Sequence, residues 1–239
     1  SKHSFKYDGL ITKIAELKSV NRLELERSLK LNESLKEFQK KGEYNAFAIR
    51  CWPEMFTEYG GAVCGPVSIM TERKVPCACE ADVYGAVSQL ILQEVSKQAV
   101  FLTDIVDIDY EDNSGVFWHC GQAPISMCDP DFTPRATIHT NRKMPLLFEF
   151  PLKAGQVTIM RVSQSFGEQK MMISRGNILK RELPFTGTSG VIRFDRHSKD
   201  VLEDIISSGL EHHVAIAYGD HVKLLSELAM ELSLPVLYF

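Results

Sequence analysis

The chain has 239 residues, of which 44% are hydrophobic and 24% are charged, and its net charge is −4. These values are ordinary for a globular protein, and the length suffices for one large domain or two smaller ones with real cores. No basic run is present, which argues against nucleic acid or an anionic membrane as a partner. No apolar stretch reaches the roughly 18–20 residues that a membrane span needs.

The six cysteines stand at positions 51, 64, 77, 79, 120 and 128, and no two of them have the Cys-x-x-Cys spacing of a zinc ribbon. We therefore expect free thiols, which are usual for a cytoplasmic protein. Residues 1–6 lack the apolar core of a signal peptide, which agrees with a cytoplasmic location.

The first half of the chain alternates helical and strand-like segments. Apolar residues at helical spacing predict a helix over residues 8–40, and Asn21 is placed to cap a second helix within this run. Strands are predicted over residues 44–51, 74–79 and 99–107, separated by helices over 64–73 and 84–97. This order predicts a partial Rossmann-like parallel sheet in a domain of residues 1–110. Because three strands make a small sheet of this type, we expect upstream strands to be missing.

After about residue 110, short runs punctuated by Pro and Gly predict antiparallel strands, in a barrel or a sandwich. These runs cover residues 116–119, 146–151, 156–164, 169–174, 176–181 and 191–194. A helix over 198–209, a strand over 213–218, a helix over 220–232 and a strand over 236–239 follow. The predicted fold class is therefore α/β followed by mainly β.

Carboxylates follow two of the predicted strands, at the position where ligands bind in α/β sheets. Glu54 and Asp82, joined by His213 from far downstream, form a set that suits a hard divalent cation such as Mn²⁺ or Mg²⁺. Glu58 competes with Glu54 for this role. Glu80 competes with Asp82, and period-two geometry would place both on one face. From spacing alone, the interpretation of these carboxylates as solvated loop residues stays open.

Histidines and aromatic residues supply further candidates. In a strand, the rings of His212 and His213 would face opposite ways, so that only one of them reaches a ligand. A nucleophilic pair of His119 and Cys120 is disfavoured, because adjacent strand residues point apart. We instead expect His119 to contact a sugar beside Trp118.

Arginines of the β-rich half, at positions 161, 175 and 193, either contact substrate or lie on the surface. Asp104, Asp107 and Asp109 are interpreted as solvated loop residues. The expected substrate-binding residues are Trp52, Trp118, His119 and Arg161.

Four segments carry a resemblance to a known family. Residues 48–52 (Ala-Ile-Arg-Cys-Trp) resemble a strand written Ala-Ile-x-x-Trp, and residues 79–86 resemble a Glu-x-Asp-x-x-x-Gly segment. Residues 118–124 are similar to a His-x-Gly-x-Ala element. Residues 211–219 resemble the segment near the C-terminal end of that family, in which His213 falls at the position of a metal-binding histidine. On these segments the chain resembles the C-terminal portion of the L-fucose isomerase and L-arabinose isomerase superfamily, closest to its fucose-isomerase-like branch.

The resemblance implies a β-barrel-type C-terminal domain, here residues 111–239, and a Mn²⁺-type cation, or Mg²⁺ or Co²⁺ in its place. Asp82 and His213 would hold the cation together with an upstream glutamate, for which an ungapped match favours Glu58 and the strand end favours Glu54. The implied activity is aldose–ketose isomerisation of a monosaccharide through an enediol, with Glu54 and Asp82 as the catalytic carboxylates, in a homo-oligomer such as a trimer or hexamer. The family's N-terminal domain lies outside the resemblance, so inactivity of this chain by itself stays an open alternative.

A second interpretation is a non-catalytic carbohydrate-binding or regulatory module with the same fold. The two interpretations differ in one observable feature. The isomerase interpretation predicts that Glu54 or Glu58, Asp82 and His213 converge within metal-ligand distances, whereas a binding module is predicted to keep a pocket with Trp52, Trp118 and arginines but an incomplete metal shell.

Overall fold

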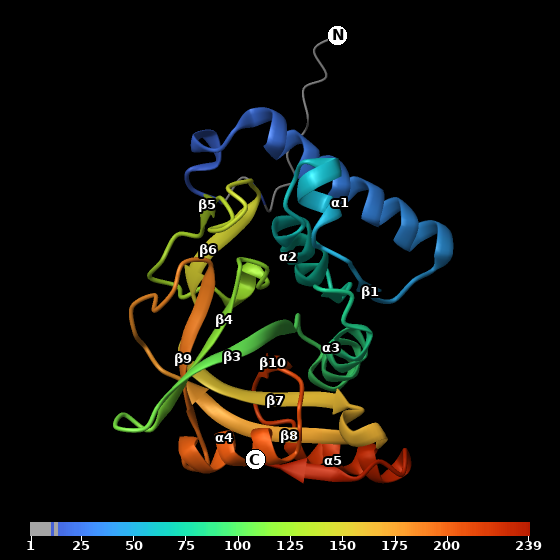
Figure 1. Ribbon diagram of the computed structural model, residues 1–239, viewed down its shortest axis with the longest axis vertical. Helices are drawn as coiled ribbons and strands as arrows, with labels where there is room; N and C mark the ends of the chain where they lie inside the picture. The colour runs from blue at the N-terminus through green and yellow to red at the C-terminus, as the bar shows by residue number, and fades with distance from the viewer. Residues whose placement is uncertain (1–10, 12–13) are drawn as a thin grey trace.

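The computed structural model describes residue 11 and residues 14–239 (Figure 1). Its centre is a closed barrel of six antiparallel strands, in which each strand pairs with the next and the last pairs back to the first. In order around the barrel, these strands are β7 (Gly155–Ser163), β8 (Lys170–Ile178), β9 (Thr188–Phe194), β4 (Ser114–His119), β3 (Phe101–Asp109) and β10 (His213–Tyr218).

Three shorter strands extend the barrel sheet. β11 (Val236–Tyr238) runs parallel to β8, β6 (Leu147–Pro151) runs parallel to β9, and β5 (Arg135–Thr137) pairs with β6. α4 (Ser198–Ser207) packs against β3 and β9, and α5 (Val222–Glu231) packs against β8. In Figure 1 both helices lie along the lower side of the barrel.

A small α/β unit precedes the barrel. β1 (Phe47–Ala48) and β2 (Cys77–Ala78) form a two-stranded parallel sheet, accompanied by α1 (Arg22–Gly42), α2 (Cys64–Glu72) and α3 (Val83–Ser96). α3 packs directly on β7 and β10, so it joins the α/β unit to the barrel wall. The predicted fold class, an α/β part followed by a mainly β barrel, is confirmed.

The parallel sheet is smaller than the sequence predicted. The strand expected over residues 99–107 forms, but as barrel strand β3, antiparallel to both β4 and β10. The physical reason is local, because a short turn at residues 110–113 returns the chain directly into β4, whereas β1 and β2 offer only two paired residues each. A division of the chain at residue 110 stays a prediction.

The helices follow the sequence closely. Asn21 caps α1, since its side-chain oxygen accepts hydrogen bonds from the backbone N–H groups of Leu23 and Glu24. The run predicted over residues 8–40 is therefore divided at Asn21, while its beginning lies outside the described residues. β5 was not predicted, because three residues are too short to show a periodic pattern.

Two apolar layers hold the barrel in place. Its interior is filled by large buried side chains, among them Phe101, Phe117, Ile159, Met172, Ile192, Val214 and Ile216. A second cluster joins the outside of β7, β8 and β10 to α3 and α5 through Leu92, Met160, Ile173, Ala215 and Leu225. Among the described residues, no helix combines the length and apolar character that crossing a membrane requires.

Candidate metal and sugar site

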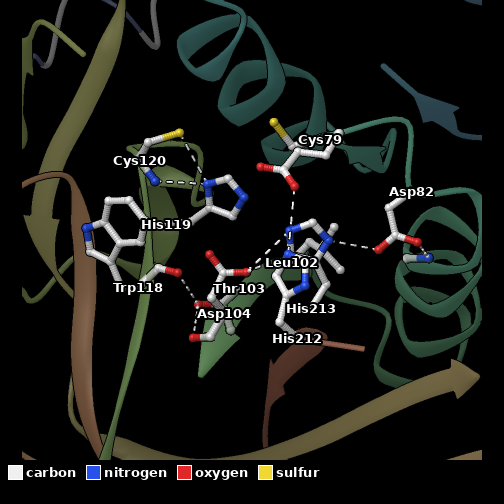
Figure 2. A network of polar contacts seen from close by, with 12 residues as sticks. Cys79, Asp82, Leu102, Thr103, Asp104, Trp118, His119, Cys120, His212 and His213 are labelled. Carbon is white, nitrogen blue, oxygen red and sulfur yellow. Dashed lines mark hydrogen bonds and ion pairs between the residues drawn. The ribbon is translucent and has the colours of Figure 1, made fainter. Parts of the chain in front are cut away.

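Polar side chains from three neighbouring barrel strands meet beside the loop that follows β2 (Figure 2). His213, the first residue of β10, pairs in register with Asp104 of β3, and Asp104 pairs in turn with Trp118 of β4. Residues directly opposite each other on adjacent strands have neighbouring side chains. His119 ends β4 and stacks on the His213 ring, with 5.6 Å between the ring centroids.

Three atoms of this cluster are buried and make no hydrogen bond within the described part of the chain. They are Asp104 Oδ1, His119 Nε2 and His213 Nε2. Each of the three residues offers a potential ligand atom, and these ligand atoms lie within 4.8 Å of one another. Buried polar atoms are almost always paired, so three unpaired ones converging on one point indicate a position for a ligand. Asp104 Oδ1 and His213 Nε2 are 3.3 Å apart. Two donors that each lie about 2.1 Å from one cation have a separation of about 3 Å.

The other nitrogen of His213 is fixed by Asp82. His213 Nδ1–H donates to Asp82 Oδ2 over 2.9 Å, because an ionised carboxylate only accepts. With Nδ1 engaged by Asp82, Nε2 is the ring nitrogen that faces Asp104 and is left to bind a ligand. A carboxylate behind a histidine in this way sets the ring's tautomer and orientation for ligation.

Asp82 itself has no oxygen left for a cation. It caps α3 by accepting from Gly85 N–H at 2.8 Å, and the Arg161 guanidinium binds both of its oxygens, at 2.5 and 3.0 Å. Burial opposes ionisation, but the hydrogen bonds from His213 and Arg161 hold the pKa of the Asp82 carboxyl well below its usual range. Asp82 and Arg161, expected to contact metal and substrate, bind each other, and Asp82 also binds His213; their expected roles stay predictions.

Glu80 and His212 form the outer side of the cluster. Their nearest side-chain atoms are 3.7 Å apart, and together with His213 they form a second group whose ligand atoms lie within 4.8 Å of one another. Asp104 Oδ1 lies 3.9 Å from His212 Nε2. Burial raises the pKa of Asp104, which the surrounding imidazoles oppose, so a cation at this point would relieve the cost of its buried charge.

The structure places Glu54 and Glu58 elsewhere. Glu54 pairs with Arg50, with 2.7 Å between the charged atoms, directly before the π-helical turn Met55–Tyr59. Glu58 lies exposed on that turn. Neither belongs to either group of potential ligands among the described residues. Of the expected set, the structure brings Asp82 and His213 into contact and leaves the upstream glutamate outside.

A cavity of about 590 Å³ opens beside this cluster. Its lining includes Trp52, Trp118 and His119, three of the four residues expected to contact substrate, and Glu80 and Asp104. The volume is within the range of small-molecule sites. Trp118 is held by a hydrogen bond from its Nε1–H to the carbonyl oxygen of Thr186, so its ring forms a fixed wall.

His119 and Cys120 do meet, contrary to the argument from strand alternation. β4 ends at His119 and the chain turns at Gly121, whose φ is +108°, so Cys120 folds back. His119 Nδ1 lies 3.3 Å from Cys120 Sγ, and the Cys64 thiol contacts the same sulfur at 3.2 Å. Although burial disfavours the imidazolium, the Cys120 thiolate raises the pKa of His119 to about 9. The hydrogen bond from Cys64, together with His119, holds the pKa of Cys120 well below its usual value.

A family model described as the C-terminal domain of L-fucose isomerase matches residues 117–239. The chain belongs to this family. The matched segment contains His119 and His213 and most of the barrel, while Glu80 and Asp104 precede it.

Curated relatives agree with this assignment. A sulfoquinovose isomerase of Priestia aryabhattai is 40% identical over 201 residues, which are 84% of this chain and 45% of the relative. A sulfoquinovose isomerase of Alkalicoccus urumqiensis is 33% identical over 213 residues, 89% of this chain and 48% of that protein. This family member therefore spans about half the length of the curated relatives that it matches.

The sequence reasoning missed two members of the cluster for identifiable reasons. Asp104 was read as a loop residue, because strand-end rules for parallel sheets were applied to a barrel strand in which it is central. Glu80 was considered, but its alternation with Asp82 does not hold, because β2 ends at Ala78 and Glu80 and Ala81 have positive φ. An antiparallel pairing of residues 99–107 with the strand at 213–218 places Asp104 opposite His213, and only that pairing identifies Asp104 as a site residue.

Proposed function

We propose that this chain is the metal-binding part of an aldose–ketose isomerase that acts on a sulfonated sugar. The observation that carries the proposal is the convergence of Asp104, His119 and His213, each with a buried atom that makes no hydrogen bond, beside a sugar-sized cavity that Asp104 and His119 line. The names of the relatives add the substrate class, since sulfoquinovose is a hexose whose C6 carries a sulfonate. A cytoplasmic homo-oligomer, a trimer or hexamer, remains part of the proposal.

The donor set fits a divalent cation. Asp104 Oδ1 and His213 Nε2 would hold it from the buried side, and Glu80 and His212 stand on the open side. A mixture of carboxylate and imidazole donors with open positions suits Mn²⁺, with Mg²⁺ or Co²⁺ as alternatives. Such a cation supplies Lewis-acid polarisation of two adjacent sugar oxygens.

Residues of the chain would transfer the proton, bind the sugar and exclude water. Glu80 lies exposed at the cavity beside the proposed metal position, so its carboxylate is placed to move a proton between C1 and C2 of the sugar through an enediol. His119 Nδ1 accepts the backbone N–H of Cys120 at 2.9 Å, so the ring would carry its proton on Nε2 and donate it as a hydrogen bond toward a sugar oxygen. Trp118 closes the cavity wall and limits water around these groups.

Calorimetric titration with Mn²⁺ tests the proposal. We expect the parent chain to bind at micromolar affinity or better, and Asp104→Asn and His213→Gln to lose that binding. Asp107→Asn, an exposed carboxylate on the same strand, is the matched control and keeps it. Chromatographic detection of a ketose formed from sulfoquinovose then tests turnover. A folded parent without Mn²⁺ affinity would contradict the metal site, and binding without turnover would favour the non-catalytic module.

A further inference from the structure

The cavity is lined by groups of both charge signs. Glu80 and Asp104 lie in its lining with His119, which belongs to the proposed metal site. Arg50 and Arg142 belong to the lining of the same cavity, together with Trp52, His139 and Asn141. A ligand that spans the cavity is therefore offered cationic guanidinium groups as well as the acidic cluster. This second feature is not needed for a neutral sugar.

The two arginines differ in their contacts. Arg50 is paired with the Glu54 carboxylate at 2.7 Å. Arg142 lies over the Trp52 ring, 3.2 Å from its centroid, and within residues 14–239 no carboxylate pairs with it. Stacking on an aromatic face holds the guanidinium plane and leaves its N–H edge free to bind a planar or tetrahedral oxyanion.

The turn that carries Arg142 is fixed by internal contacts. The backbone N–H groups of Asn141 and Arg142 both donate to His139 Nδ1, at 3.2 and 3.3 Å. The His139 ring packs edge-on against Phe56, 5.3 Å from its centroid, and Phe56 in turn packs beside Trp52. The cationic side chain and the ring beneath it are thus placed by one connected set of contacts.

We propose that Arg142, stacked on Trp52, binds the anionic group at the far end of the sugar whose C1 and C2 oxygens face Asp104 and His213. The inference rests on the proposed function and adds the residue that selects a sulfonate or phosphate ester over an uncharged hexose. Guanidinium binds such oxyanions through paired hydrogen bonds, which are stronger than bonds between neutral groups. The Trp52 side chain is 45% exposed, so core packing does not account for its position. Support of the Arg142 guanidinium does account for it.

Calorimetry on this chain with Mn²⁺ present tests the subsite, using three probes: the sulfonated hexose, glucose 6-phosphate and glucose. The variants are Arg142→Gln, Arg142→Lys and Lys143→Gln, the last being the matched control. Lys143 carries the same charge on the same turn, is exposed and is not among the residues that line the cavity. Mn²⁺ affinity is measured for every variant in a separate titration.

We expect the parent to bind an anionic hexose more tightly than glucose, and Arg142→Gln to lower that affinity about 10- to 100-fold. Glucose and Mn²⁺ affinities stay unchanged in Arg142→Gln, Arg142→Lys recovers part of the loss, and Lys143→Gln behaves as the parent. The tighter of the two anionic probes assigns the group as sulfonate or phosphate. Equal loss in Lys143→Gln, no loss in Arg142→Gln, or no preference of the parent for anionic hexoses would overturn the subsite. If the parent does not bind Mn²⁺, that result counts against the proposed function and not against the subsite.

Discussion

His213 donates from Nδ1 to Asp82 over 2.9 Å, and Asp82 is in turn held by both terminal nitrogens of Arg161. Asp82 caps α3, while Arg161 and His213 lie on β7 and β10, so the barrel wall and the start of the helix packed on it jointly fix the ring. In the proposed site, Asp82 would therefore support a metal ligand, whereas the sequence predicts it as a ligand itself. This arrangement separates residues that would bind a cation from residues that would aim a ligand at it.

Asp82→Asn is expected to weaken Mn²⁺ affinity without abolishing it. An amide still reaches His213 but no longer favours a proton on Nδ1, and the loss of such an orienting carboxylate costs about 10- to 100-fold in affinity. Asp104→Asn removes a donor and should cost more. Calorimetry at a temperature at which both variants are folded makes the comparison, and a larger loss in Asp82→Asn would place Asp82 on the metal instead.

The loss of folding stability at acidic pH should also depend on Asp82. Its pKa is lower in the folded chain than its ordinary value of 3.8, so the unfolded chain binds the proton more tightly. The resulting stabilisation is present above pH 3.8 and is lost as the pH falls through the folded-state pKa. Asp82→Asn should lack this dependence.

At pH 7 the same variant should be about 3 kcal/mol less stable, because it leaves the buried Arg161 without its main carboxylate partner. Urea denaturation of the metal-free chain between pH 2 and pH 7 measures both effects. Asp107→Asn serves again as control, and an equal acid slope in the parent and in Asp82→Asn would refute the assignment.

Glu54 and Glu58 should be dispensable for metal binding. Glu54 is engaged with Arg50 and Glu58 lies exposed on the turn after it, and neither belongs to a ligand group among the described residues. Glu54→Gln and Glu58→Gln are each expected to keep Mn²⁺ affinity within about 2-fold of the parent. A loss of binding in either variant would reinstate that glutamate as the missing acidic ligand.

The sequence was sufficient for the fold class because periodicity is a local property. Alternation over residues 156–164 and helical spacing over 220–232 each report one element, and both elements form. The site depends on which strands pair, and pairing is not local. Once β3 lies between β4 and β10, Asp104 faces His213, whereas a parallel sheet would have placed it away from both histidines.

The contact between His119 and Cys120 provides the last prediction. The His119 ring is buried, yet its pKa is raised to about 9, chiefly because the Cys120 thiolate lies beside it. Cys120→Ser removes the negative charge while burial remains. We therefore expect the pKa of His119 to fall in this variant.

NMR titration of the imidazole signals in the metal-free chain measures this change. Taken alone, the raised pKa of His119 would give stability that is present below pH 6.5 and is lost as the pH rises through about 9. The lowered pKa of Cys120 acts in the opposite direction over the same range, so the two effects offset each other and the NMR titration is the measurement that tests the contact. Cys77→Ser is the control, since Cys77 is buried apart from His119 and burial raises its pKa. An unchanged His119 titration in Cys120→Ser would mean that the thiolate is not the source of the shift.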